Sequence, residues 1–430
     1  MSITNTSHIV DNNKLKSDNN YDNESSLNSS IPNDWSEVQL KNIGNTFTGI
    51  SGKNKDDFGF GKPYIPYLNI FNNAIIKDDH FDYVNIKDNE TQEKVKYGDI
   101  FFTTSSETPE EVGMCSVYLG NSQELYLNSF CFGFRLTNDI DFSPIYLAEL
   151  FRSNVGRRTI YKLAQGATRY NLSKTSLLKE NIFVPPFKQQ QKIAEILSTW
   201  DEAIFILKQT SETLRDRNKG LAQQLLTGKK RLKGFNDSWL TKRIKDFSLE
   251  ISSKNKEDED LIVLSCTKHR GLIPSLEYFG RKIYSDNLKT YKIVEKNVFA
   301  YATNHIEEGS IGYQNKYEKA LISPMYTVFK TNDDINDEFL FRVLKSNTYI
   351  QEYQKRMEGS IDRRGGLRWQ EFCKIKVNVP SYEEQTVIAL ALETADQELK
   401  SYETKLEALQ LQKKGLMQQL LTGKIRVNVK

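Results

Sequence analysis

Two long stretches of the chain carry mainly apolar side chains at alternating steps of four and three residues. Steps of four and three are typical of the seam of a left-handed coiled coil. The first seam comprises Ile193, Leu197, Trp200, Ile204, Leu207, Ser211, Leu214, Asn218, Leu221 and Leu225. The second seam comprises Ile388, Leu392, Ala395, Leu399, Tyr402, Leu406, Leu409, Lys413, Leu416 and Leu420. The pattern therefore predicts two long helices, over residues 188–229 and 383–424.

The two predicted helices are copies of one another. A shift of 195 residues superposes them without a gap, and QQLLTGK occurs at both 223–229 and 418–424. A Val-Pro pair precedes each helix, and proline restricts the residue before it to extended geometry. A Thr-Gly pair closes each helix, as expected of a C-terminal stop. Gly220 and Gly415 lie inside the last turns, where close approach of another backbone and simple tolerance are equally good explanations.

The seams predict how the helices pair. An antiparallel pairing that sets Ile193 opposite Leu420 places the Lys413 ammonium over the Trp200 indole, a favourable cation–π geometry. Its other polar pairs are Ser211 with Tyr402 and Asn218 with Ala395. A parallel pairing instead stacks Asn218 on Lys413, which leaves these polar groups less well matched. We expect the antiparallel arrangement.

The parts of the chain outside the seams mix two kinds of pattern. Short strand-like runs alternate with helical patterns near 143–153 and 336–346, which predicts the α+β class. The first 30 residues contain seven Asn and seven Ser with few large apolar side chains, which favours disorder. The expected organisation is a disordered leader over 1–30, a globular domain over 31–187, a helix over 188–229, a second globular domain over 230–382, a helix over 383–424 and a tail over 425–430.

Composition narrows the class of protein. Mean hydropathy is -0.57 and no long apolar run occurs, which argues against a membrane span. The four cysteines are dispersed, and no signal-peptide pattern is present, so we expect a cytoplasmic protein with buried free thiols. The net charge of +3 neither favours nor excludes a nucleic-acid partner.

Together the doubled features resemble a known family. Each globular part ends in Val-Pro, each helix begins with a Gln-containing start (QQQKIA at 189–194, EQTVIA at 384–389) and each closes on QQLLTGK. This combination, over residues 32–427, resembles the specificity subunit of type I restriction-modification systems. The short motifs Gly98-Asp99-Ile100 and Gly166-Ala167-Thr168-Arg169 are also similar to that family.

The resemblance implies a function. Each globular part would be a target-recognition domain that reads one half of a bipartite, asymmetric sequence in double-stranded DNA through the major groove. The antiparallel helices would set the spacing and dock two methyltransferase subunits, which would carry S-adenosylmethionine. Restriction and translocase subunits would join the full complex, and this chain would bind no cofactor itself.

Local charge supports a DNA partner. Residues 150–179 include seven basic side chains and no acidic one. Arginine can neutralise phosphate or bond guanine, and tyrosine offers a hydroxyl and a stacking face. The candidate DNA contacts are Arg152, Arg157, Arg158, Arg169, Tyr170 and Lys174 in the first domain, and Lys355, Arg356, Arg363, Arg364 and Arg368 in the second. The alternative for any one of them is a solvated basic face.

The sequence offers no catalytic constellation. The four histidines form no metal-ligand spacing with one another or with the cysteines, and no GxxxxGK phosphate loop occurs. Val184-Pro185-Pro186-Phe187 resembles an amino-methyltransferase motif but has valine where a polar side chain must hold the target amine. We therefore expect a non-catalytic subunit that binds no metal. A DNA-modifying enzyme with an unrecognised site and a scaffold that binds proteins are the competing interpretations.

Overall fold

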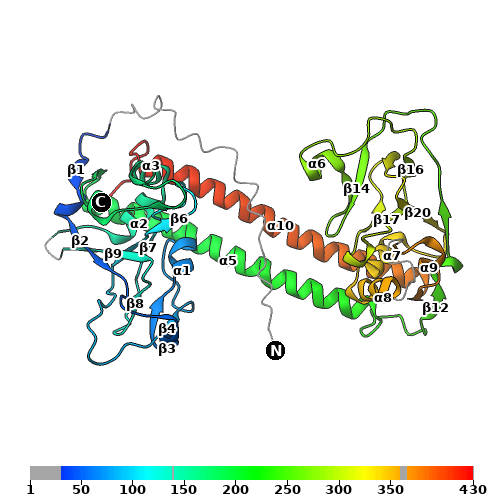
Figure 1. The fold of residues 1–430 in the computed structure, drawn as a ribbon, viewed down its shortest axis with the longest axis horizontal. Coiled ribbons are helices and arrows are strands. Elements are labelled where there is room, and N and C mark those ends of the chain that lie inside the picture. The colour runs from blue at the N-terminus through cyan, green and yellow to red at the C-terminus, as the bar shows by residue number, and fades with distance from the viewer. Residues whose placement is uncertain (1–30, 138–139, 359–365, 430) are drawn as a thin grey trace. The chain divides into compact units, whose positions relative to one another are not determined.

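The computed structural model describes residues 31–137, 140–358 and 366–429 (Figure 1), so the predicted leader lies outside the described residues. The chain forms two compact units. Unit 1 combines Met1–Leu207 with Lys405–Lys430, and unit 2 is Lys208–Thr404. The long helices α5 (Phe187–Leu226) and α10 (Tyr382–Leu420) each contribute one part to each unit. Among the described residues, none of the helices combines the length and apolar character needed to span a bilayer.

Unit 1 is a mixed α/β body. Its largest sheet is antiparallel, in the order β2 (Gly44–Thr48), β9 (Cys131–Leu136), β5 (Ile100–Thr103), β7 (Cys115–Val117). A second sheet contains β4 (Asp82–Val84), β3 (Phe58–Ile65) and β8 (Tyr126–Leu127). Two-stranded pairs join β1 (Ser36–Gln39) to β11 (Asn181–Val184), and β6 (Ser105–Ser106) to β10 (Tyr170–Asn171). The short helices are α1 (Tyr67–Asn72), α2 (Pro144–Arg152), α3 (Asn154–Leu163) and α4 (Lys174–Leu178).

Unit 2 repeats this plan with different residues. One antiparallel sheet runs β13 (Ser248–Ile251), β20 (Tyr326–Thr331), β17 (Val298–Ala302), β18 (Ile311–Gln314). A second runs β15 (Gly271–Pro274), β14 (Val263–Thr267), β19 (Lys319–Ile322), β16 (Lys292–Glu295), and β12 (Leu240–Arg243) pairs with β21 (Lys376–Val379). The short helices are α6 (Ser275–Phe279), α7 (Asp337–Leu344), α8 (Asn347–Glu358) and α9 (Trp369–Phe372). The prediction of two α+β domains is confirmed.

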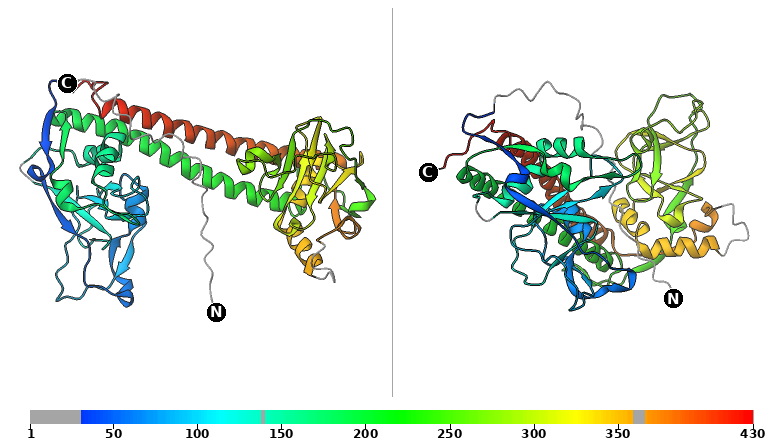
Figure 2. Two further views of the ribbon diagram at one scale, coloured as in Figure 1. Left: turned by 45° about the horizontal axis from the view of Figure 1, so that its top comes forward. Right: turned by 60° about the vertical axis from the view of Figure 1, so that its left-hand side comes forward.

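The two long helices run side by side in opposite directions within each unit (Figures 1 and 2). Every predicted seam position is buried or half-buried, whereas the residues between them are mostly exposed. The start of α5 and the end of α10 belong to the core of unit 1, through Ile193 and Leu420. In unit 2 the Asn218 amide donates a hydrogen bond to the Ala395 carbonyl, at 2.7 Å. This contact confirms the antiparallel register predicted from the seams.

The repeated QQLLTGK marks the end of each helix. Gly228 and Gly423 have φ of +69° and +73°, the left-handed conformation that glycine adopts without strain. A Cβ on Gly423 would lie 2.5 Å from Cγ of Pro32, so the chain also passes too close for a side chain. Three residues after Gly228, Arg231 forms a bidentate ion pair with Glu384, at 2.6 and 2.7 Å.

The glycines inside the last helical turns have no close neighbours. A Cβ built on Gly220 or Gly415 meets nothing within 4 Å. Close approach of another backbone therefore does not explain these glycines, and tolerance does. We expect Gly220→Ala to raise the free energy of unfolding by about 0.5–1 kcal/mol, because alanine has the higher helix propensity. Urea unfolding measures the change, and a loss of stability would reveal a steric requirement.

Candidate nucleic-acid interface

The predicted motif at 166–169 forms the tip of a hairpin in unit 1. Gln165 and Asn171 exchange backbone hydrogen bonds at 3.1 and 2.8 Å, which brings the two arms together. Gly166 has φ of +136°, and a Cβ there would lie 1.9 Å from the Arg169 carbonyl oxygen, so this tight turn requires glycine. The turn leaves Arg169 exposed at the tip.

The base of this hairpin has a counterpart in unit 2. The Leu172 N–H donates to the Thr104 carbonyl at 2.9 Å, and the Leu367 N–H donates to the Thr303 carbonyl at 2.9 Å. Leu172 and Leu367 are 195 residues apart, the same shift that relates the helices. By that shift Arg169 corresponds to Arg364, which, with Arg363, lies outside the described residues.

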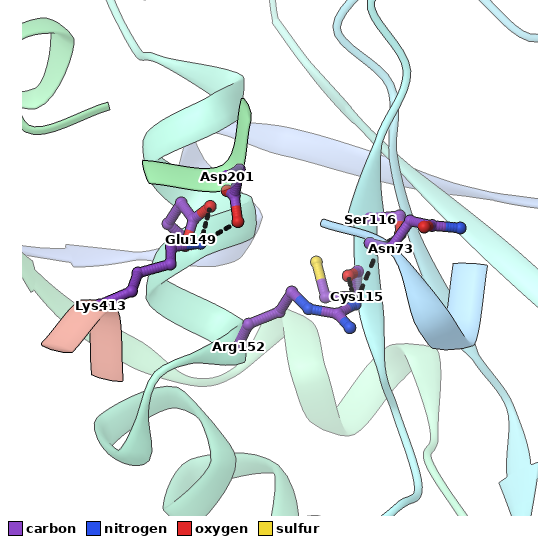
Figure 3. Close-up of polar contacts among 7 residues, drawn as sticks. All are labelled: Asn73, Cys115, Ser116, Glu149, Arg152, Asp201 and Lys413. Atoms are coloured by element: carbon purple, nitrogen blue, oxygen red, sulfur yellow. Dashed lines mark hydrogen bonds and ion pairs between the residues drawn. The ribbon is translucent and has the colours of Figure 1, made fainter. Parts of the chain in front are cut away.

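Arg152, a predicted DNA contact, lies instead inside unit 1. Its guanidinium donates to the carbonyls of Asn73, at 3.0 Å, and Cys115 (Figure 3). It also donates to the carbonyls of Phe71, at 3.0 Å, and Ile70. Burial lowers the pKa of this side chain. The prediction is wrong for Arg152, because its donors already bond the carbonyls of neighbouring segments.

Arg157 requires the same correction. Its side chain donates to the Gly113 carbonyl at 2.9 Å and the Glu110 carbonyl at 2.7 Å, and the residue is buried. Arg152 therefore connects α2 to α1 and β7, and Arg157 connects α3 to the loop at 110–113. A charge run in the sequence does not distinguish a buried arginine that caps carbonyls from an exposed one.

The remaining predicted contacts fall into two groups. In unit 1, Arg158, Tyr170 and Lys174 are half-buried. In unit 2, Lys355 and Arg368 are exposed, whereas Arg356 pairs with Glu352 at 2.9 Å. Arg169, Lys355 and Arg368 are therefore the predicted residues whose exposure best suits a DNA contact, and their role stays a prediction.

Lys413 occupies a buried polar cluster rather than a position over an indole. Its ammonium lies 3.1 and 3.2 Å from the two carboxylate oxygens of Glu149 and 2.6 Å from an Asp201 oxygen (Figure 3). The predicted cation–π contact with Trp200 is therefore replaced by ion pairs. Glu149 comes from α2, outside both seams, so the helical periodicity could not reveal it. We call Glu149, Asp201 and Lys413 the unit-1 cluster.

The unit-1 cluster contains two carboxyl groups and one amine. Burial raises the pKa of Glu149 to about 7; Lys413 lowers it and Asp201 raises it. Arg152 is the other charged group near these carboxyls. Glu149 therefore holds a proton in the folded chain at pH values where it would be ionised in the unfolded chain.

This proton makes stability depend on pH. Between pH 5 and 6.5 the folded state binds the extra proton, so the free energy of unfolding should fall by about 2 kcal/mol as pH rises. In Glu149→Gln this contribution is absent. The difference between the wild type and Glu149→Gln in urea unfolding should therefore vary over this range, and a constant difference would contradict the assignment.

One group was not anticipated from the sequence. Donor atoms of His305, Glu307 and Glu308 lie within 4.8 Å of one another around a short turn in unit 2. His305 and Glu308 are exposed, and exposed acidic groups commonly lie close together in proteins without binding a metal ion.

Cys115 and Cys131 are buried free thiols, as expected, whereas Cys266 and Cys373 are half-buried.

Two mixed α/β bodies of one plan, each joined to part of an antiparallel helix pair, define the class of internally repeated two-domain proteins. The type I restriction modification DNA specificity domain matches residues 32–216 and again residues 236–411. The chain belongs to this family, and it is a DNA sequence-recognition subunit with two target-recognition domains.

Individual relatives agree with this assignment. The chain is 26% identical to the putative type I restriction enzyme MjaX specificity subunit of Methanocaldococcus jannaschii, covering 92% of this chain and 95% of that one. It is also 26% identical to the MjaVIII specificity subunit of the same organism, over 58% of this chain and 63% of that protein. The fold matches the type I S subunit from M. genitalium with a TM-score of 0.54 at 15% identity, covering 94% of this chain and 98% of the other.

Proposed function

We propose that each target-recognition domain reads one half of a bipartite DNA sequence through the major groove, and that the two halves differ. The observation that carries this proposal is the internal repeat: two domains of one plan differ in sequence. By the 195-residue shift Arg169 corresponds to Arg364, whereas Tyr170 corresponds to Gly365. Domains that present different side chains are expected to read different bases.

The helix pair is assigned to spacing and assembly. We infer that α5 and α10 set the separation of the two half-sites and dock two methyltransferase subunits, which supply S-adenosylmethionine and catalysis. Restriction and translocase subunits complete the assembly. This chain then acts in the cytoplasm as a non-catalytic subunit that binds double-stranded DNA and holds no cofactor of its own.

Methylation mapping tests the proposal. The chain is co-expressed with a cognate methyltransferase subunit, and methylated positions in the host DNA are sequenced. One bipartite motif with two unlike halves is expected, and replacement of residues 32–186 with another family member's domain should change one half alone. A change in both halves would contradict the assignment of one half-site to each domain. Methyl transfer by the isolated chain would contradict the non-catalytic assignment.

Arg169→Ala should weaken binding to the cognate duplex by about 10- to 100-fold, because the tip loses a guanidinium that bonds phosphate or guanine. Lys41→Ala, which removes an exposed cation elsewhere in unit 1, serves as the control. Gel shifts at fixed salt measure both variants. Equal affinity of Arg169→Ala and the wild type would remove the hairpin from the interface.

A further inference from the structure

In each unit, an equivalent contact holds the recognition domain against the helix pair. The Gln190 amide oxygen accepts a hydrogen bond from the Ser143 N–H at 3.1 Å, and the Gln385 amide oxygen accepts one from the Asn336 N–H at 2.8 Å. Ser143 and Asn336 are the N-caps of α2 and α7. The two helices therefore start at corresponding places on the helix pair, and residues equally far from the caps correspond.

Six residues after these caps the two domains carry opposite charges. The position is Glu149 in α2 and Arg342 in α7. Glu149 is 1% exposed and pairs with Lys413. Arg342 instead pairs with Asp396, at 2.7 Å. Each domain thus presents one charged side chain to the helix pair at the same place, but the sign differs.

The helix residues that face these positions change with the charge. Asp201 and Asp396 correspond by the 195-residue shift, so the aspartate is common to both units. The same shift relates Lys413, which pairs with the acidic domain residue, to Asn218, whose amide bonds the Ala395 carbonyl and accepts from Arg217. We call Arg342, Asp396 and Asn218, which stand at the positions of Glu149, Asp201 and Lys413, the unit-2 cluster. A lysine accompanies the glutamate, and a neutral asparagine accompanies the arginine.

Exchanging the partners would leave unbalanced charge at either site. A domain bearing Glu149 placed opposite Asn218 would set two carboxyl groups together without the lysine, so Glu149 would have to hold a proton or stay ionised beside Asp201. A domain bearing Arg342 placed opposite Lys413 would set two cations beside one carboxylate. Buried charge without an opposite partner is strongly destabilising, which disfavours the exchange at Glu149, a residue that is 1% exposed. Arg342 is half-buried and Asp396 is exposed, so the exchange in unit 2 is disfavoured less strongly.

We propose that the unit-1 and unit-2 clusters determine which helix segment each recognition domain accepts, so that the first half of the chain pairs with the second half and not with a second copy of itself. Two first halves would bring Asn218 to the place of Lys413, and two second halves would bring Lys413 to the place of Asn218. Both mismatches are electrostatic. The apolar seams, in contrast, are alike enough to permit either pairing, so specificity resides in the polar positions.

The test converts one cluster into the other within the full chain. Glu149→Arg and Lys413→Asn are made singly and together, and hydrogen exchange of α2 peptides measures the opening of unit 1. Each single variant should increase exchange at least about tenfold, because Glu149→Arg sets a second cation beside Lys413 and Lys413→Asn removes the ammonium that bonds both carboxyl groups. The double variant, which has the residue types of the unit-2 cluster, should return to within about threefold of the wild type. If the increase in the exchange rate of the double variant is instead about the product of the two single increases, the proposal is wrong.

The reciprocal exchange in unit 2 is an independent check. Arg342→Glu and Asn218→Lys are made singly and together, and α7 peptides report the exchange. Here too the double variant should be protected better than either single variant. Lys414→Asn and Gln209→Lys make the same kinds of change at exposed positions and should leave exchange unaltered. If either control changes hydrogen exchange as much as the variant that it matches, the change results from net charge and the proposal is wrong.

Discussion

Arg152→Leu should lower the free energy of unfolding of unit 1 by about 3–5 kcal/mol. The guanidinium of Arg152 donates to carbonyls of two separate segments: the end of α1 (Ile70, Phe71 and Asn73) and Cys115 in β7. The Ser116 hydroxyl lies within reach of the carbonyls of Ile70 and Asn73, and its single proton can serve one of them at a time. The carbonyls of Phe71 and Cys115 lose the donor they have in Arg152, and each such loss costs about 1–3 kcal/mol.

Arg152→Lys is the matched control, because unit 2 already uses a lysine at this place. Lys345 lies nine residues after its N-cap, as Arg152 does, and donates to the carbonyls of Lys268 and Gly309 at 2.7 Å and of Thr267 at 3.2 Å. An ammonium can therefore cap several carbonyls in this setting. We expect Arg152→Lys to lose less than half of the stability that Arg152→Leu loses in urea unfolding.

The same pair of variants separates a structural role from a DNA contact. At a temperature where Arg152→Leu stays folded, its affinity for the cognate duplex should match that of the wild type. Unchanged stability with weakened DNA binding would restore the interpretation drawn from the basic run. Loss of stability with unchanged binding supports the carbonyl contacts.

The helix pair could be predicted because its physics is local and periodic. Apolar side chains every three or four residues specify a buried stripe, and the polar interruptions at Asn218 and Lys413 restrict the register. The register holds at Asn218, which contacts Ala395. The partner of Lys413 could not be predicted, because Glu149 lies some 260 residues away in the sequence and belongs to a helix outside the stripe.

The recognition domains were harder to derive, since their contacts are long-range. The basic run includes Arg169, which is exposed on a hairpin, and its contact with DNA stays a prediction. The prediction drawn from this run failed at Arg152 and Arg157, whose exposure depends on the orientation of α2 and α3. The internal repeat indicates the structural role of Arg152, because Arg152 corresponds to Lys345 and both side chains donate to backbone carbonyls. A basic residue kept at one place in two otherwise divergent domains indicates a shared structural requirement.

Gln190→Met should lower the free energy of unfolding of unit 1 by about 2–5 kcal/mol. Gln190 is 2% exposed; its amide oxygen accepts from the Ser143 N–H, and its amide nitrogen donates to the Pro185 carbonyl at 2.9 Å. Methionine fills a similar volume but replaces neither hydrogen bond, so a buried N–H and a buried carbonyl lose their partner. The Ser143 N–H lies at the N-cap of α2, which carries Glu149, so we also expect faster hydrogen exchange there.

The chain supplies a closely matched control at the next position. Gln191 is exposed, and Gln191→Met makes the same chemical change on the same helix without touching Ser143 or Pro185. It should be nearly neutral in urea unfolding. Gln385→Met should reproduce the loss in unit 2, because Gln385 bonds the Asn336 N–H and the Pro380 carbonyl in the same way. Equal effects of Gln190→Met and Gln191→Met would mean that lost helix polarity, and not the contact with the N-cap, sets the cost. In that case the amide would not be what holds each recognition domain to its helix.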